Sequence, residues 1–199
     1  MKKGIFIVIE GIDGSGKSEI VKLLSSYFFS KNYNVLSTRE PTDSPIGKEI
    51  RAMLRNEKNP ESGSGRLMEL FIKDREHHLK DEIEPFLKKE NSIVVCDRYY
   101  YSTIAFQSAQ GLDTKLLISK NSRFLKPDIA FVLDVEPETA LKRIEYREKE
   151  KFEKLDFMKR IRNNFLKMPK LMKDNIKIID ASNPINSVFN QIKDEIESL

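Results

Sequence analysis

Residues 11–18, GIDGSGKS, combine residue types and spacing that suit the binding of phosphate. The chain has only eight glycines, and three of them fall within six residues of this segment. Glycine lets backbone N–H groups turn around an anion, the Lys17 ammonium can reach β- and γ-phosphates, and the Ser18 hydroxyl can hold Mg²⁺. Because an apolar run precedes the segment and a helical pattern follows it, we expect a loop that binds a nucleoside triphosphate.

The elements that position this loop follow a pattern of short apolar runs separated by helical patterns. The predicted strands are residues 5–10, 34–38, 92–97, 129–134 and 177–180, and helices fill the gaps, including residues 64–87 and 184–199. This alternation is typical of a five-stranded parallel sheet with helices on both faces, so we predict an α/β fold of the P-loop NTPase class. The segments REPTDS, DRYYYS and VEP each follow a strand, which places them with the loop at the carboxyl edge of the sheet.

Length and composition favour a single domain over residues 1–199 that works on small anions. Lys and Arg total 35 against 31 Asp and Glu, a net charge of +4, and the charges alternate instead of forming blocks, so we expect no nucleic-acid partner. No apolar run approaches the length that spans a bilayer and no signal peptide is visible, so we expect a soluble, cytoplasmic protein without a membrane partner. The lone Cys96 is expected in the core in its reduced form.

Arginines that follow strands indicate a second, phosphorylated substrate. Arg39, Arg51, Arg75 and Arg98 offer bidentate donors for phosphate and planar contacts for bases. The chain contains neither the guanine-reading [NT]KxD of Ras-type GTPases nor the LSGGQ-like signature of transporter ATPases. A kinase is therefore favoured, and a nucleotide-dependent switch or partner-binding ATPase is the alternative from a different class.

Seven segments, taken in order, resemble the successive motifs of thymidylate kinases. They run from about residue 4 to residue 182: EGIDGSGKS, TREP, EIR, LFIKDREHHL, CDRYYYSTIAFQ, KPDIAFVLDVEPETALKRI and IDAS. The resemblance implies transfer of the γ-phosphate of ATP to dTMP, giving dTDP, with Mg²⁺ as cofactor and a homodimer as the usual assembly. Another nucleoside monophosphate or deoxynucleoside kinase on the same fold is the nearest alternative.

The ATP side of the site is expected around the phosphate loop. Lys17 and the loop amides would hold the triphosphate, and Ser18 and Asp97 would bind Mg²⁺. The resemblance places Asp13 near the metal and the reacting phosphates, and a helix N-cap is the alternative role of Asp97. The expected ATP-binding residues are Gly11, Asp13, Gly14, Ser15, Gly16, Lys17, Ser18 and Arg143.

The acceptor phosphate is expected beside the segments that follow the second and third strands. Arg51 and Arg98 resemble the dTMP-phosphate ligands of the family, and Arg39 and Glu40 lie on the same loop. Surface salt bridging is the alternative role of these arginines.

The thymine base is expected against one helical face. Phe71 could stack on the pyrimidine while Arg75, four residues later, donates to its O4. Further contacts are expected from Thr103 at the sugar or base, from Phe106 beneath the deoxyribose and from Gln107 at the base edge. Core packing is the alternative role of Phe106.

A charged segment over residues 143–156 resembles the mobile lid of the family. Ser15 leaves the phosphate loop without an added basic side chain, so the lid is expected to supply that charge. Arg147 is the predicted transition-state cation, which completes a catalytic set with Asp13, Lys17 and Arg98, and Arg143 would lie against adenine. A solvated charged helix is the alternative interpretation of this segment.

Overall fold

A computed structural model of the chain describes residues 4–56, 63–144 and 151–199. It confirms the five predicted strands, which are β1 (Ile5–Glu10), β2 (Asn34–Arg39), β3 (Ser92–Asp97), β4 (Ile129–Asp134) and β5 (Ile176–Asp180). Strand β2 ends one residue later than predicted and β5 begins one residue earlier, because Arg39 and Ile176 still pair with their neighbours, Asp97 and Ala130. The alternation of apolar runs was thus sufficient to find every strand of the sheet.

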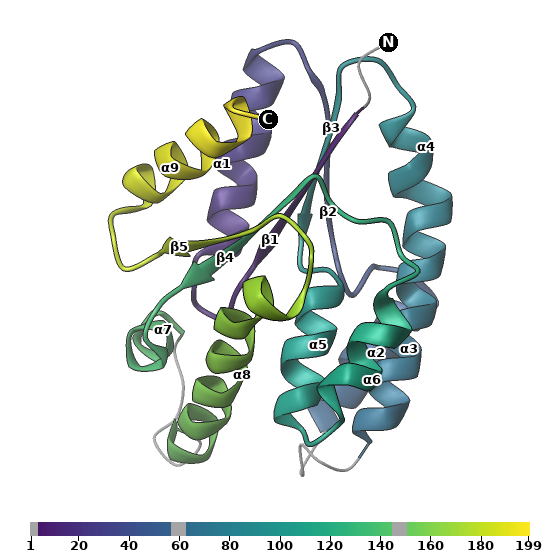
Figure 1. Ribbon diagram of the computed structural model, residues 1–199, viewed down its shortest axis with the longest axis vertical. Coiled ribbons are helices and arrows are strands. Elements are labelled where there is room, and N and C mark those ends of the chain that lie inside the picture. The colour runs from purple at the N-terminus through teal and green to yellow at the C-terminus, as the bar shows by residue number, and fades with distance from the viewer. Residues whose placement is uncertain (1–3, 57–62, 145–150) are drawn as a thin grey trace.

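The strands form one parallel sheet in the order β2-β3-β1-β4-β5. Strand β1 is central, with Val8 opposite Cys96 of β3 and Ala130 of β4. Since all strands run the same way, their carboxyl ends lie along one edge, toward the lower part of Figure 1. The segments that follow β1, β2 and β3 are therefore brought together at that edge.

Helices cover both faces of this sheet (Figure 1). Helices α1 and α9 pack on each other over one face, and α3, α5 and α8 lie on the other, where α5 contacts both α3 and α8. This confirms the predicted α/β arrangement. The helices are α1 (Lys17–Ser30), α2 (Pro45–Asn56), α3 (Ser64–His78), α4 (Glu84–Leu87), α5 (Tyr100–Ala109), α6 (Thr114–Asn121), α7 (Pro137–Arg143), α8 (Lys151–Leu171) and α9 (Ile185–Glu197).

The helix predicted over residues 64–87 changes its pitch near the end. A π-helical turn, Leu79–Ile83, separates α3 from α4. The backbone N–H of Glu84 donates to the carbonyl oxygen of Leu79, five residues back, and the next residue, Pro85, has no N–H with which to restore the four-residue spacing. Helix α9 is likewise shorter than predicted, because Pro184 and Ser198 serve as its caps.

The core is built on the three central strands. All but the first residue of β1 and all but the last of β3 and β4 are buried, as expected for strands covered on both faces. Cys96 lies in this core, as predicted; burial raises the pKa of its thiol, and Sγ donates to the carbonyl oxygen of Arg98 at 3.0 Å. Within the described ranges, no helix is both long and apolar enough to cross a membrane.

Two adjacent phenylalanines of α1 test how much of the stability depends on this packing. Phe28 is 5% exposed and its ring meets those of Tyr27 and Tyr33, whereas Phe29 is 75% exposed. We expect Phe28→Ala to lower the free energy of unfolding by about 3–5 kcal/mol. Phe29→Ala, the matched control, should change it by no more than about 0.5 kcal/mol. Urea unfolding of both variants measures this, and equal losses would show that burial at position 28 does not matter.

Candidate active site

The phosphate loop lies between β1 and α1, as the motif predicts. Gly14 has a φ of 79°, and a side chain there would place Cβ 2.4 Å from the carbonyl oxygen of Ala140. Gly16 precedes the first turn of α1 with a φ of 98°. Both positions need the left-handed conformation that glycine adopts without strain, and the loop amides come to lie at the positive end of α1.

Lys17 is held under the loop. It is 7% exposed, and its Nζ donates to the carbonyl oxygen of Ile12 at 2.9 Å. Burial lowers the pKa of Lys17 to about 8, and the positive charge of Arg98 acts in the same direction. A bound polyphosphate would favour the charged form of this side chain.

Ser18 and Asp97 meet across the loop, as expected of residues that bind one metal ion. Ser18 Oγ donates to Asp97 Oδ2 at 3.0 Å. Among the described residues, Asp97 Oδ1 and Ser15 Oγ are buried without a hydrogen-bond partner, and no cluster of three or more His, Cys, Asp or Glu side chains could hold a metal. One hydroxyl and one carboxylate fit Mg²⁺, which keeps few protein ligands and completes its shell with phosphate oxygens and water.

Arg98 connects the strand β3 to the phosphate loop. It has a φ of 70°, and its backbone N–H donates to the carbonyl oxygen of Ile9. In its guanidinium, Nη1 donates to the carbonyl oxygen of Gly11 at 3.2 Å and Nη2 donates to Asp13 Oδ1 at 2.5 Å. The predicted acceptor arginine thus touches the predicted ATP loop directly.

Glu10 is a site residue that sequence analysis missed. It is fully buried at the end of β1 and accepts hydrogen bonds from the backbone N–H of Tyr99 at 2.8 Å and of Ser102 at 3.0 Å, and from Ser102 Oγ at 2.6 Å. Burial raises the pKa of Glu10 to about 7, and the charge of Arg98 opposes that rise. The signal was present, because a single charged residue closes the apolar run IFIVIE.

Arg39 and Arg51 converge on the loop after β2. Arg51 Nη1 donates to the carbonyl oxygens of Pro41 at 2.9 Å and Thr42 at 2.8 Å. Nη2 of each arginine lies 3.0 Å from Asp43 Oδ1, a second residue that sequence analysis did not select. Arg51, a predicted phosphate ligand, and Arg39, a predicted substrate-binding residue, are therefore neighbours around one carboxylate.

Arg75, the residue expected to donate to thymine O4, is enclosed by protein groups in the structure. Its side chain has no exposed surface; Nε and Nη2 donate to Glu40 Oε2 at 2.9 and 2.7 Å, and Nη1 donates to Asn121 Oδ1 at 2.6 Å. Glu40 is only 2% exposed in its side chain and also contacts His78. Arg75 and Phe71 both lie on α3, four residues apart, as predicted. The guanidinium of Arg75, however, binds the buried carboxylate of Glu40 and the side-chain amide of Asn121.

The other predicted base and sugar residues lie on α3 and α5. Phe71 is half-buried against Ile50, Leu67 and Leu70. Thr103 is buried and accepts from Arg75, while half-buried Phe106 lies under the Arg98 guanidinium at 5.2 Å. Gln107 Nε2 donates to Gln110 at 3.1 Å, and Gln107 Oε1 is buried with no partner among the described residues, so it is an acceptor suited to a ligand N–H.

The structure describes residues 143, 144 and 151–156 of the predicted lid segment. Arg143, at the end of α7, donates to the carbonyl oxygens of Gly14 at 3.4 Å and Ala181 at 3.2 Å, so it lies beside the phosphate loop and the IDAS segment. Arg147 lies outside the described residues.

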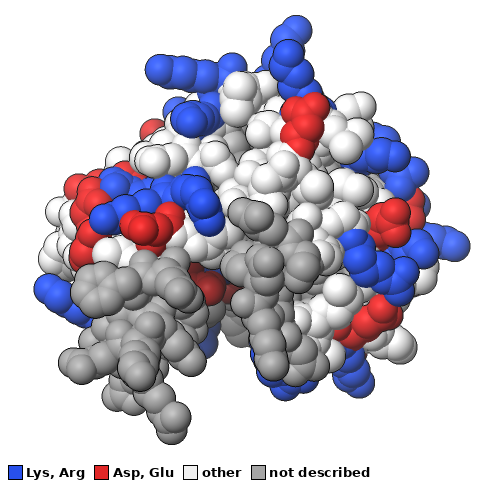
Figure 2. All heavy atoms as spheres, turned by 90° about the horizontal axis from the view of Figure 1, so that it is seen from below, with Lys and Arg blue, Asp and Glu red and all other residues white. Residues whose placement is uncertain are grey.

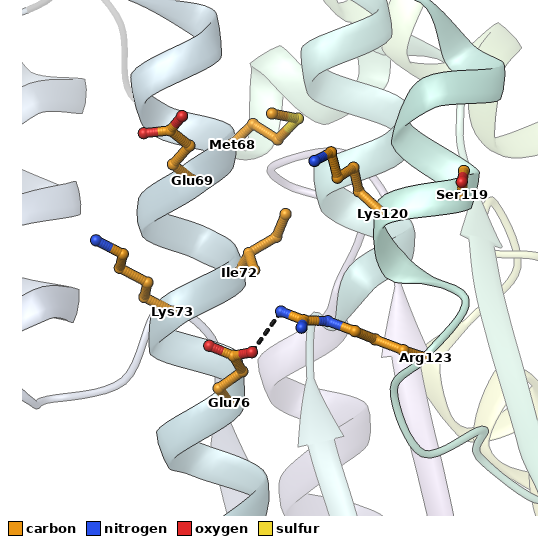
Figure 3. A pocket seen from close by; sticks show the side chains of 8 residues that line it. All are labelled: Met68, Glu69, Ile72, Lys73, Glu76, Ser119, Lys120 and Arg123. Carbon is orange, nitrogen blue, oxygen red and sulfur yellow. Dashed lines mark hydrogen bonds and ion pairs between the residues drawn. The ribbon is translucent and has the colours of Figure 1, made fainter.

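The described surface has a mixed charge distribution (Figure 2) and a further cavity. On the described part of the face seen from below, basic and acidic side chains are intermixed instead of forming one basic surface (Figure 2). A separate cavity of about 400 Å³ lies between α3 and α6, with Met68 and Ile72 on one wall and Lys120 on the other (Figure 3). An ion pair of Glu76 with Arg123 closes one end of it, and none of the predicted site residues lines it.

The sequence matches the family model described as "Thymidylate kinase" over residues 9–192. Two relatives match almost from end to end. A "Probable thymidylate kinase" of Pyrococcus horikoshii is 41% identical over 196 residues, which cover 96% of this chain and 94% of the relative. The "Thymidylate kinase" of Clostridium novyi is 34% identical over 202 residues, covering 97% and 98%.

The fold agrees with these matches. The crystal structure of thymidylate kinase from Ehrlichia chaffeensis superposes with a TM-score of 0.77 at 29% identity, covering 98% of this chain and 100% of that one. By sequence along its whole length and by fold, the chain belongs to the thymidylate kinase family.

Proposed function

We propose that this thymidylate kinase transfers the γ-phosphate of ATP to dTMP at the carboxyl edge of its sheet, with Mg²⁺ as cofactor. An oxygen of the dTMP phosphate bonds to the γ-phosphorus while the bond from that phosphorus to the bridging oxygen breaks, so that dTDP and ADP leave. The observation that carries this proposal is the contact of Arg98 with Gly11 and Asp13, because it brings an acceptor arginine to the donor loop. In-line transfer needs this proximity and little covalent chemistry from the protein.

On the ATP side, the loop amides and Lys17 bind the β- and γ-phosphates. Ser18 and Asp97 would hold Mg²⁺, which neutralises phosphate charge when bound. The unpartnered Oδ1 of Asp97 supports this role. Asp13 orients Arg98 and would lie near Mg²⁺ when the ion is bound. Arg143 would border the adenosine end of the loop, and Arg147 would supply a cation to the transition state.

On the dTMP side, Arg39, Arg51 and Arg98 bind the acceptor phosphate. The nucleoside lies against α3 and α5, where it contacts Phe71, Thr103, Phe106 and Gln107. Buried Gln107 Oε1 accepts from the N3–H of thymine, which supports the choice of a pyrimidine. The buried pair of Arg75 and Glu40 would lie beneath the base, and a contact of Arg75 with thymine O4 requires that pair to rearrange.

We propose a single kinase domain that works as a homodimer in the cytoplasm, without nucleic-acid or membrane partners.

ADP release from ATP and Mg²⁺ tests the reaction, with dTMP, dUMP, dCMP, dGMP, AMP and thymidine offered one at a time. We expect turnover with dTMP, less with dUMP, and little with purine nucleotides or thymidine. The thymine methyl is worth only about 1–3 kcal/mol, whereas an unpaired buried polar group rejects a wrong base more strongly. Equal hydrolysis in every mixture, or hydrolysis without any acceptor, would contradict a kinase.

Lys17 gives the reaction a measurable proton linkage. In the free enzyme its pKa is about 8, and triphosphate binding should raise that pKa because it stabilises the ammonium. At pH 8, ATP binding should therefore take up about half a proton, and the uptake should fade toward pH 6, where Lys17 is already charged. The dependence of calorimetric binding enthalpy on the ionisation enthalpy of the buffer measures this uptake.

Lys17→Arg is the matched control, because arginine stays charged throughout this range. This variant should bind ATP without the proton uptake at pH 8. Uptake of the same size in both proteins would assign the proton to another group.

A further inference from the structure

The loop after β2 carries a carboxylate between two arginines that the reaction needs. Asp43 Oδ1 lies 3.0 Å from Nη2 of Arg39 and 3.0 Å from Nη2 of Arg51, and Asp43 Oδ2 lies 3.4 Å from Arg39 Nη2. Its side chain is 74% exposed, so it bridges the arginines from the solvent side. A phosphate that binds both guanidinium groups would have to take the same position.

The surrounding loop holds this carboxylate in place. The residues on either side of Asp43 are tied to buried Asp74 of α3: Thr42 donates through its N–H and Oγ1, and Ser44 through Oγ. The side chains of Thr42 and Ser44 are thus held against α3. The carboxylate of Asp43 is left to face the arginines and water.

Backbone carbonyl oxygens also hold the guanidinium of Arg51 in place. Its Nη1 bonds the carbonyl oxygens of Pro41 and Thr42, so the guanidinium can turn little, and Nη2 points to whatever anion lies in front of it. In the structure that anion is Asp43. The pKa of Asp43 is lowered, first by the hydrogen bond from Arg39, so the carboxylate is charged at neutral pH.

We propose that Asp43 is a specificity-determining residue, whose carboxylate occupies the acceptor-phosphate position between Arg39 and Arg51 until a phosphate dianion displaces it. The inference rests on the proposed role of these two arginines in binding the dTMP phosphate. One carboxylate against two guanidinium groups leaves a net positive charge. A dianion gains more from this site than the carboxylate or any single-charged anion, and therefore displaces Asp43 where a monoanion does not.

Displacement requires little rearrangement of the protein. The Asp43 side chain is already largely hydrated and can turn outward without burying its charge. Arg51 keeps its bonds to the two loop carbonyls throughout. The carboxylate thus lowers the affinity of the phosphate site and selects for ligands that carry a full phosphate group.

Asp43→Asn, which keeps the shape and removes the charge, tests this inference by calorimetry on the whole enzyme. Exposed ion pairs have modest strength, so we expect dTMP to bind about two- to fivefold more tightly and its KM to fall similarly. Binding of thymidine, which lacks the phosphate, should not change. Inorganic phosphate should also bind more tightly, and the gain should shrink at high salt.

Glu195→Gln is the matched control; it removes a carboxylate of α9 that pairs with Lys177 of β5, and it should leave dTMP binding unchanged. The tightening by Asp43→Asn should disappear in a background that already carries Arg39→Ala and Arg51→Ala. Weaker dTMP binding in Asp43→Asn would overturn the inference, because Asp43 would then position the arginines. Equal tightening of thymidine would overturn it as well, since the charge would not act through the phosphate.

The reaction is tested separately, by ADP release from ATP with dTMP and the unmodified enzyme. If the unmodified enzyme phosphorylates dTMP but Asp43→Asn binds it as before, the inference alone fails. If the unmodified enzyme shows no turnover with dTMP, the proposed function fails, whatever the substitution does to phosphate binding.

Discussion

The hydrogen bonds of Glu10 to the first turn of α5 hold the two halves of the site together. This buried carboxylate ends β1 and accepts from the N–H groups of Tyr99 and Ser102, and Ser102 Oγ also accepts from Arg98. Without Glu10, the N–H of Tyr99 would be buried and unsatisfied, at about 1–3 kcal/mol, and the N–H of Ser102 would keep only its bond to the carbonyl oxygen of Tyr99. This turn fixes the position of Arg98, whose φ is 70°. The position of Arg98 in turn sets the distance between the phosphate loop and the acceptor phosphate.

Charge in the site is arranged by burial as much as by sequence. Burial lowers the pKa of Lys17, and the charge of Arg98 adds to that effect, whereas burial raises the pKa of Glu10 even though its hydrogen-bond donors favour the charged form. Arg75 and Glu40 neutralise each other in a fully buried pair, which removes them from the solvent. Arg39, in contrast, is 63% exposed, so it can exchange one anion for another. Exposure thus separates the supporting charges from those that can meet a ligand.

Local pattern was enough to predict the fold, and only part of the site. The strands and the phosphate loop follow from apolar runs and from glycines, and the meeting of Ser18 with Asp97 follows from the shared edge of a parallel sheet. The partners of Arg75 could not be predicted, because Glu40 and Asn121 lie far from it in sequence. Glu10 was missed although it is the single charged residue of an apolar run, whereas Asp43 was missed because its contacts with Arg39 and Arg51 exist only in the folded loop. A carboxylate after a strand has no role until its neighbours are known.

Cys96 shows what the same packing means for chemical reactivity. Only a thiolate attacks alkylating reagents and disulfides. Burial raises the pKa of this thiol, and helices cover both faces of the sheet to which it belongs (Figure 1). As the one cysteine of the chain, it is a natural reporter group: a reagent can mark it only when β3 opens. Its Sγ also donates to the carbonyl oxygen of Arg98. The rate at which Cys96 is labelled would therefore report how often β3 and the adjoining part of the active site open.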